Sequence, residues 1–211
     1  MNTHTVSAHD AKGHVTASTP AHYVLHGTTA GSRRLARAWL RLALAALLGS
    51  GLFSVLLVLA RTPGINTLLP GGDFFRVALV VHVDLSVLVW FVAIAGMLWS
   101  LNLRPAIAPG TRLAAQLAWA LCAAGALGMA LAPFIDSGAA IMANYIPMID
   151  SAAFRAALLV FAAGGLLLVL LTMICTVPIG PAVDGTGALR FGLHASAVAA
   201  AVALLAFGWS V

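Results

Sequence analysis

Polar and apolar positions separate into long blocks along this chain. At 1.5 Å per residue, about 20 apolar residues in a helix cross a hydrocarbon core ~30 Å thick. Pro and Gly mark the breaks between the apolar blocks, as expected of connecting loops. The pattern therefore predicts an all-α, polytopic membrane helix bundle with five transmembrane helices in one domain, residues 35–211. The helices are expected near 36–60, 75–101, 111–133, 152–175 and 187–210.

The composition supports a membrane protein and excludes several other classes. Of the 211 residues, 62% are hydrophobic and 8% are charged, whereas a soluble domain has about 25% charged residues. Ala, Leu and Val dominate, which favours helices over the alternating strands of a barrel. The net charge of +5 does not indicate nucleic-acid binding, because the arginines are scattered at the ends of apolar runs. We expect membrane lipid, and no nucleic acid, around this chain.

Residues 1–34 are rich in Thr, Ser, His, Ala and Gly and lack apolar periodicity. This composition predicts a disordered tail. A cleavable signal peptide is not expected, since the apolar run that follows the basic residues is long enough to span the membrane. The tail histidines are able to bind metal, but we interpret them as solvated residues. They are His4, His9, His14, His22 and His26.

Basic residues near short loops predict the orientation, because cytoplasmic loops carry an excess of Lys and Arg. One group of arginines precedes the first helix, and a second group flanks the loop between the second and third helices. Both groups place the amino terminus in the cytoplasm, for a protein of a bacterial-type inner membrane. The residues are Arg33, Arg34, Arg37 and Arg41 in the first group and Arg104 and Arg112 in the second.

The second apolar stretch contains two ionisable residues, His82 and Asp84. A charge inside a membrane helix costs ~2.5–3.5 kcal/mol on insertion scales, so each is a functional candidate. His82 lies about seven residues, or ~10 Å, from the outer end of its helix. That depth suits an axial ligand of a haem whose propionates reach the outer surface. A hydrogen bond to a neighbouring helix explains the imidazole equally well.

Two further residues of this helix have alternative roles. Arg76 lies roughly 9 Å outward from His82 and can pair with haem propionates or extend to the membrane interface. Asp84 is about 200° around the helix from His82, so the two side chains cannot address the same atom. We expect a polar contact between helices for Asp84, with a proton path as the alternative.

Other residues narrow the possible metal chemistry. His194, in the fifth stretch, is predicted to differ in depth from His82 by ~15 Å, so the two cannot ligate one haem. Cys122 and Cys175 lie in apolar runs without a CxxC spacing, which gives no support to zinc or an iron–sulfur cluster.

In the loop before the fourth helix, Asp150 is expected to cap that helix or lie in its first turn. Pairs of glycines at residues 125 and 128 and at residues 164 and 165 are expected to permit close helix packing.

The segment from Phe75 and Arg76 through His82, Asp84 and Ser86 to Trp90 and Phe91 resembles the second helix of subunit I of the haem–copper oxidases. The loop at 144–147 is similar to the loop at that place in the same family. The resemblance covers roughly residues 36–211, and its distinctive part is the segment around His82. It implies the amino-terminal five helices of a twelve-helix fold. It also implies that His82 is an axial ligand of a low-spin haem of b or a type.

The resemblance implies a cytochrome c oxidase-like function that this chain cannot perform alone. The second low-spin ligand, the high-spin haem ligand and the copper ligands of that family belong to later helices, so they are expected on a complementary chain. Electrons would pass from the low-spin haem to an oxygen-reducing centre there, and other oxidase subunits are expected as partners. The chain would then be one half of a split subunit, a fragment or a relic.

Three alternatives remain open. A nitric oxide reductase-like subunit would share these helices and the first ligand. A membrane scaffold or relic without haem would use His82 and Asp84 only to bond neighbouring helices. A small transporter would use Asp84 as its coupling carboxylate, but the five helices show no inverted repeat.

Overall fold

The computed structural model describes residues 28–69, 73–104, 108–136, 138–142, 146–179 and 185–210. Five helical segments in this part of the chain are long and apolar enough to cross a membrane. Their bounds agree with the predicted spans to within a few residues, except at the start of the first. They are α1 (Ala30–Ala60), a continuous second span made of α2 (Phe74–Val83), η2 (Asp84–Val89) and α3 (Trp90–Leu101), then α4 (Pro109–Ile135), α5 (Ala152–Cys175) and α6 (Thr186–Ser210).

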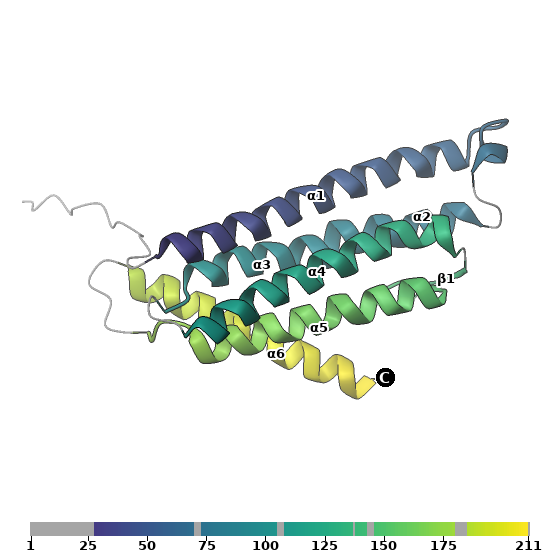
Figure 1. The fold of residues 1–211 in the computed structure, drawn as a ribbon. Coiled ribbons are helices and arrows are strands. Elements are labelled where there is room, and N and C mark those ends of the chain that lie inside the picture. The colour runs from purple at the N-terminus through teal and green to yellow at the C-terminus, as the bar shows by residue number, and fades with distance from the viewer. Residues whose placement is uncertain are drawn as a thin grey trace, which may run out of the picture.

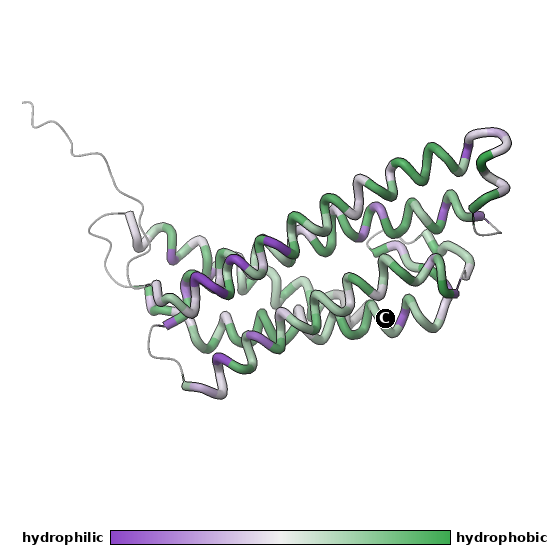
Figure 2. The backbone as a smooth tube through the Cα atoms, turned by 45° about the horizontal axis from the view of Figure 1, so that its top comes forward, coloured by the Kyte–Doolittle hydropathy of each residue, from purple (hydrophilic) through white to green (hydrophobic). Residues whose placement is uncertain are grey.

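The spans form the helical bundle of an integral membrane protein. In Figure 1, α1, the second span, α4 and α5 run side by side, and α6 crosses at an angle next to α5. A short 3-10 turn, η1 (Asn66–Leu68), lies between α1 and α2. Figure 2 shows mostly hydrophobic residues along the middle of the bundle, with hydrophilic residues concentrated toward the helix ends and loops. This distribution is the one a bilayer requires.

The start of α1 differs from the sequence-based expectation. Thr29 and Ser32 form a reciprocal capping box, in which the Ser32 backbone N–H donates to Thr29 Oγ1 at 3.1 Å and the Thr29 N–H donates to Ser32 Oγ at 2.9 Å. Such a box satisfies two free donors at a helix start. The helix therefore begins at Ala30, not near 36, and residues 30–34, which we expected in the disordered tail, are helical. Residues 1–27 lie outside the described part of the chain.

Close packing of α4 on α5 confirms the predicted role of three of the four glycines. A Cβ atom on Gly125 would lie 2.5 Å from the Phe161 backbone nitrogen, and one on Gly164 would lie 2.8 Å from the Cys122 backbone nitrogen. Gly128 meets Ala157 in the same way. Gly165, in contrast, faces open space. Small residues thus allow the two backbones to approach, as is common between membrane helices.

Both cysteines are free thiols. Cys122 is buried in the α4–α5 interface, where its Sγ lies 3.6 Å from the Phe161 carbonyl oxygen. A buried thiol of this kind packs as a small apolar side chain with a weak donor.

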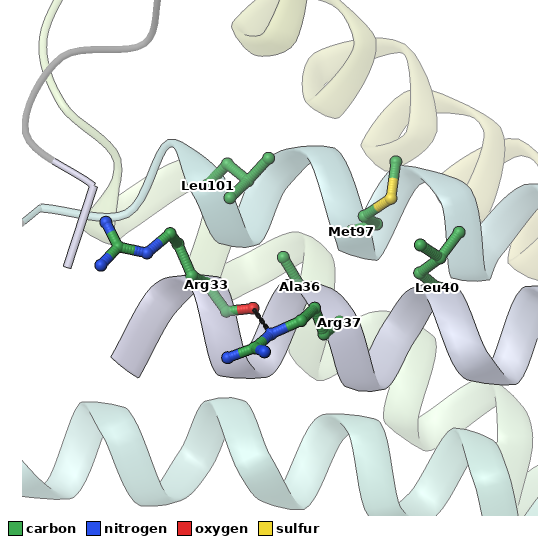
Figure 3. Close-up of a pocket in the computed structure, with 6 residues that line it drawn as sticks. All are labelled: Arg33, Ala36, Arg37, Leu40, Met97 and Leu101. Atoms are coloured by element: carbon green, nitrogen blue, oxygen red, sulfur yellow. Dashed lines mark hydrogen bonds between the residues drawn. The ribbon is translucent and has the colours of Figure 1, made fainter. Parts of the chain in front are cut away.

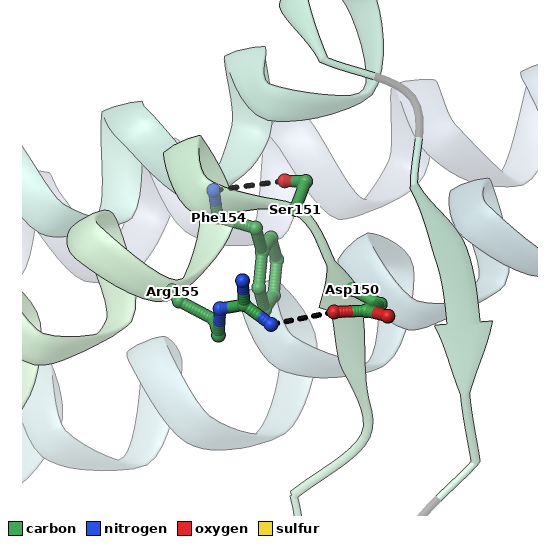
Figure 4. Close-up of polar contacts among 4 residues, drawn as sticks. All are labelled: Asp150, Ser151, Phe154 and Arg155. Carbon is green, nitrogen blue, oxygen red and sulfur yellow. Dashed lines mark hydrogen bonds and ion pairs between the residues drawn. The ribbon is translucent and has the colours of Figure 1, made fainter.

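The all-α prediction misses a small antiparallel hairpin between α4 and α5. Strand β1 (Ala139–Ile141) pairs with β2 (Met148–Asp150), with Ala140 opposite Ile149. The expected role of Asp150 is also corrected. Ser151 caps α5, because its hydroxyl accepts from the Phe154 N–H at 3.1 Å, whereas Asp150 forms an ion pair with Arg155 (Figure 4). Asp and Ser are both favoured caps, so adjacent candidates could not be separated by sequence.

Candidate functional site

His82 lies near the end of α2, and its imidazole points at α1. Its Nδ1 atom lies 2.8 Å from Ser50 Oγ, 3.1 Å from Ser54 Oγ and 2.9 Å from the Ser50 carbonyl oxygen. Ser50 is buried and Ser54, one turn further along α1, is half-buried. The contact with a neighbouring helix that we considered for His82 is therefore present, and it involves one of its two ring nitrogens.

These contacts fix which ring nitrogen carries the proton of a neutral His82. A carbonyl oxygen can only accept a hydrogen bond, so the short approach of Nδ1 to the Ser50 carbonyl requires a proton on Nδ1. In a neutral imidazole the lone pair is then on Nε2. A histidine that ligates a metal commonly has this arrangement, in which one nitrogen donates to a carbonyl or carboxylate and the other binds the metal.

The backbone at His82 is held by two serine hydroxyls. Ser50 Oγ donates to the His82 carbonyl oxygen at 3.0 Å, and Ser86 Oγ donates to the same oxygen at 2.7 Å. Two residues after His82 the helix widens into the π-helical segment η2, which begins at Asp84. Single π-helical turns within α-helices often occur at functional sites. The serines and the widened turn together define the position of the ring relative to α1.

Asp84 is the most deeply buried charged residue of the described chain, with 1% of its surface exposed. Its Oδ2 atom has no hydrogen-bond partner among the residues that the structure describes. Asp84 therefore does not share the serine contacts of His82, as their angular separation predicts. The polar contact between helices that we expected for Asp84 is not seen for this oxygen. Burial of a carboxyl oxygen without a hydrogen-bond partner costs free energy.

Arg76 lies in the first turn of α2, at the start of the second span, and forms an ion pair with Asp73. The Arg76 Nε atom is 3.0 Å from Asp73 Oδ2, and the two side chains are 66% and 55% exposed. Asp73 also caps α2, because its Oδ1 accepts from the Arg76 N–H at 3.3 Å. An exposed ion pair of this kind is weak, so it leaves the guanidinium available to a stronger anionic partner. Its contact with haem propionates stays a prediction.

His194 has hydrogen-bond partners at both ring nitrogens. Nε2 lies 2.8 Å from Thr176 Oγ1, and Nδ1 lies 2.9 Å from the Arg190 carbonyl oxygen. The imidazole therefore joins α6 to the residue that follows α5. Since Nδ1 donates to the Arg190 carbonyl and Nε2 is hydrogen-bonded to the Thr176 hydroxyl, neither ring nitrogen is free to bind a metal. The expectation that His194 does not share a haem with His82 is consistent with this arrangement.

Within the ranges that the structure describes, no cluster of three or more His, Cys, Asp or Glu residues is placed to hold a metal ion. The hydrogen bonds of the His82 imidazole in the described structure all involve Nδ1, so Nε2 is the atom that would bind a haem iron. Low-spin haem requires a second axial ligand. That ligand is not supplied by His194, the other histidine of the described chain.

Sequence reasoning did not find Ser50 and Ser54. A signal for them exists: they lie one helical turn apart in an apolar run, and Ser50 is flanked by Gly49 and Gly51. Ser50 lies ten residues before the end of α1 and His82 eight residues after the start of α2. Because the two helices run antiparallel side by side, residues at these offsets from the adjacent helix ends are at similar depth. Matching polar residues by depth would have paired them.

Comparison with known proteins does not assign an activity to this site. No protein-family model and no solved structure matches this chain. A protein of Rickettsia prowazekii (strain Madrid E), described as "Uncharacterized protein RP382", is 40% identical over 65 residues. That stretch is 31% of this chain and 13% of the Rickettsia protein. The chain is thus similar to a short part of a much longer protein, and the match assigns no activity.

Proposed function

We propose that this chain is the amino-terminal portion of a haem–copper oxidase-like subunit I, in which His82 is an axial ligand of a low-spin haem. The observation that carries the proposal is the arrangement around the imidazole. Nδ1 lies 2.9 Å from the Ser50 carbonyl oxygen, which leaves the Nε2 lone pair for iron. The resemblance of residues 75–91 to the ligand-bearing helix of that family supports the same assignment.

Three side chains near His82 would support a haem ligand at this position. The Ser50 carbonyl oxygen accepts from Nδ1, which would keep the ring in the tautomer that an iron ligand needs, and the Ser50 and Ser54 hydroxyls lie beside the same atom. Arg76, at the outer end of the same span, would contact the propionates. A low-spin haem held there would supply a one-electron redox centre. The role of this chain is therefore to bind and orient that group next to the oxygen-reducing centre of another chain.

The proposal requires a complementary chain. The second axial ligand, the high-spin haem ligand and the copper ligands would come from it, and other oxidase subunits would complete the assembly. Oxygen reduction by a cytochrome or a quinol is the proposed reaction of the whole complex. Reduction of nitric oxide would use the same helices and the same ligand.

The charge distribution supports an amino terminus in the cytoplasm. Within the described residues, seven arginines and no acidic residue lie at the end of the bundle where α1 begins. They are Arg33, Arg34, Arg37, Arg41, Arg104, Arg112 and Arg190. At the opposite end three arginines are balanced by three aspartates. Because basic residues are retained on the cytoplasmic side, we assign the arginine-rich end to the cytoplasm of a bacterial-type inner membrane.

A second candidate function is a membrane scaffold without haem. The contacts of His82 with Ser50 and Ser54 favour it, since they satisfy part of the imidazole by a neighbouring helix alone. The two candidates differ at Nε2, which the scaffold does not use.

Difference spectroscopy separates these candidates. The chain is purified from its native membrane together with its partners, and reduced-minus-oxidised spectra are recorded for wild type, His82→Ala and His194→Ala. The proposal predicts that His82→Ala removes a low-spin haem band and that the matched control His194→Ala retains it, because both nitrogens of His194 are already bonded. Identical spectra for all three proteins would reject the haem assignment in favour of the scaffold.

A further inference from the structure

A pocket of about 450 Å³ lies between α1 and α3, at the arginine-rich end of the bundle. Figure 3 shows Arg33 and Arg37 from α1 at the end nearer the helix start, with Leu40 and Met97 further along. Ala36 is buried and forms the floor, and Leu101 completes the α3 side. The pocket is therefore a groove with a basic end and an apolar end.

Both arginines at the basic end are available to an anion. Their side chains are exposed, and their hydrogen bonds are to backbone carbonyls and one hydroxyl: Arg33 donates to Thr28, and Arg37 donates to the Arg33 carbonyl at 3.4 Å. Neither guanidinium forms an ion pair with a residue in the described ranges. Two arginines that form no ion pair in the described ranges and lie one helical turn apart match a phosphate group in charge.

The depth of the groove matches the boundary between lipid headgroups and acyl chains. Helix α1 has 31 residues, or about 46 Å at 1.5 Å per residue, which exceeds a ~30 Å hydrocarbon core. Residues 42–60 carry no charge, and their length of about 28 Å fits that core. Arg37 then lies about 7 Å outside the hydrocarbon, at headgroup level, while Leu40 and Met97 border the acyl region.

We propose that the groove between α1 and α3 binds one anionic phospholipid, with the phosphate between Arg33 and Arg37 and the start of an acyl chain over Ala36, Leu40 and Met97. Charge complementarity argues for an anionic headgroup, and the apolar end argues for an attached chain in place of a free anion. A lipid held there would contact α1, which carries Ser50, and α3, which continues the span that carries His82. The proposal does not depend on whether His82 binds haem.

Native mass spectrometry of the full-length, detergent-purified chain tests this site. Phosphatidylglycerol or phosphatidylcholine is titrated into wild type, the double variant Arg33→Gln/Arg37→Gln, and the control Arg34→Gln/Arg41→Gln. The control removes the same charge from the same helix end but from residues that do not line the groove. We expect wild type to retain phosphatidylglycerol on the order of tenfold more strongly than phosphatidylcholine.

The groove variant should lose that preference, and the control should keep it within about twofold. Equal losses in the two double variants would show only a general attraction to the basic surface and would overturn the site. Glycerol phosphate in large excess should fail to displace the lipid. Displacement by glycerol phosphate would show an anion site without the acyl groove and would also overturn the proposal. Size-exclusion elution confirms that each variant is folded.

Discussion

The α4–α5 interface allows a sharp test, because two adjacent glycines of α5 have opposite surroundings. A Cβ atom on Gly164 would lie 2.8 Å from the Cys122 backbone nitrogen and 2.9 Å from the Ala118 carbonyl oxygen. Real Cβ atoms do not approach backbone that closely, so Gly164→Ala must separate the helices. Gly165→Ala adds the same methyl group into open space.

The expected magnitude follows from these distances. Overpacking a buried site typically costs 1–3 kcal/mol, and the atoms that Gly164→Ala meets are backbone, which cannot rotate away. We expect Gly164→Ala to lower the free energy of unfolding by about 2 kcal/mol, or roughly thirtyfold in the equilibrium constant. Gly165→Ala should leave it unchanged or raise it by up to about 0.5–1 kcal/mol, because Ala is the better helix former.

Unfolding by a denaturing detergent, followed by the fluorescence of the buried tryptophans Trp39 and Trp99, measures both variants in a micelle. Membrane helices largely persist in such an unfolded state, so the gain in helix propensity at Gly165 is expected at the low end. The reasoning is refuted if Gly164→Ala and Gly165→Ala unfold at the same detergent fraction. That result would mean that α4 and α5 are not held at the distance set by Gly164.

Three further predictions concern single sites. Ser50→Ala combined with Ser54→Ala should lower the free energy of unfolding by about 1–2 kcal/mol in the same assay. The double variant should keep the haem band, because the Ser50 carbonyl remains, and loss of the band would contradict the role of that carbonyl as the acceptor for Nδ1. Asp84→Asn should also keep the band, since Asp84 does not share the contacts of His82, and a lost band would place Asp84 at the haem. Ser151→Ala should lower the free energy of unfolding by about 1 kcal/mol, and Asp150→Asn should lower it by less. A larger loss for Asp150→Asn than for Ser151→Ala would contradict the assignment of Ser151 as the cap of α5.

The membrane spans were predictable because long apolar blocks leave few alternatives. Any helix of some 20 apolar residues must be buried in lipid or protein, so periodicity and composition sufficed for α1 to α6. The hairpin at 139–150 was not predictable in this way. Its strands are three residues long, too short to show an alternating pattern. The start of α1 was missed because Thr29 and Ser32 cap the helix from within a polar stretch that resembled the rest of the tail.

The surroundings of the candidate ligand were predictable only in part. The position of His82 in an apolar run identified it as a candidate, and its depth followed from helical rise. The carbonyl of Ser50 as the partner of Nδ1 could not be predicted, because it depends on the rotation of α1 against α2 and not on residue type. The π-helical turn at Asp84 had no sequence signal that we recognised, since no Pro or Gly lies between Asp84 and Val89.

The most direct test of the central claim is rescue of the iron site by free imidazole. His82→Gly removes the ring and leaves the Ser50 carbonyl in place, so an added imidazole can donate one N–H to that carbonyl and direct its other nitrogen to iron. With the chain purified together with its partners, we predict that His82→Gly loses the low-spin haem band and that imidazole restores it. A spectrum unchanged by His82→Gly, with or without imidazole, would contradict the assignment of His82 as a haem ligand.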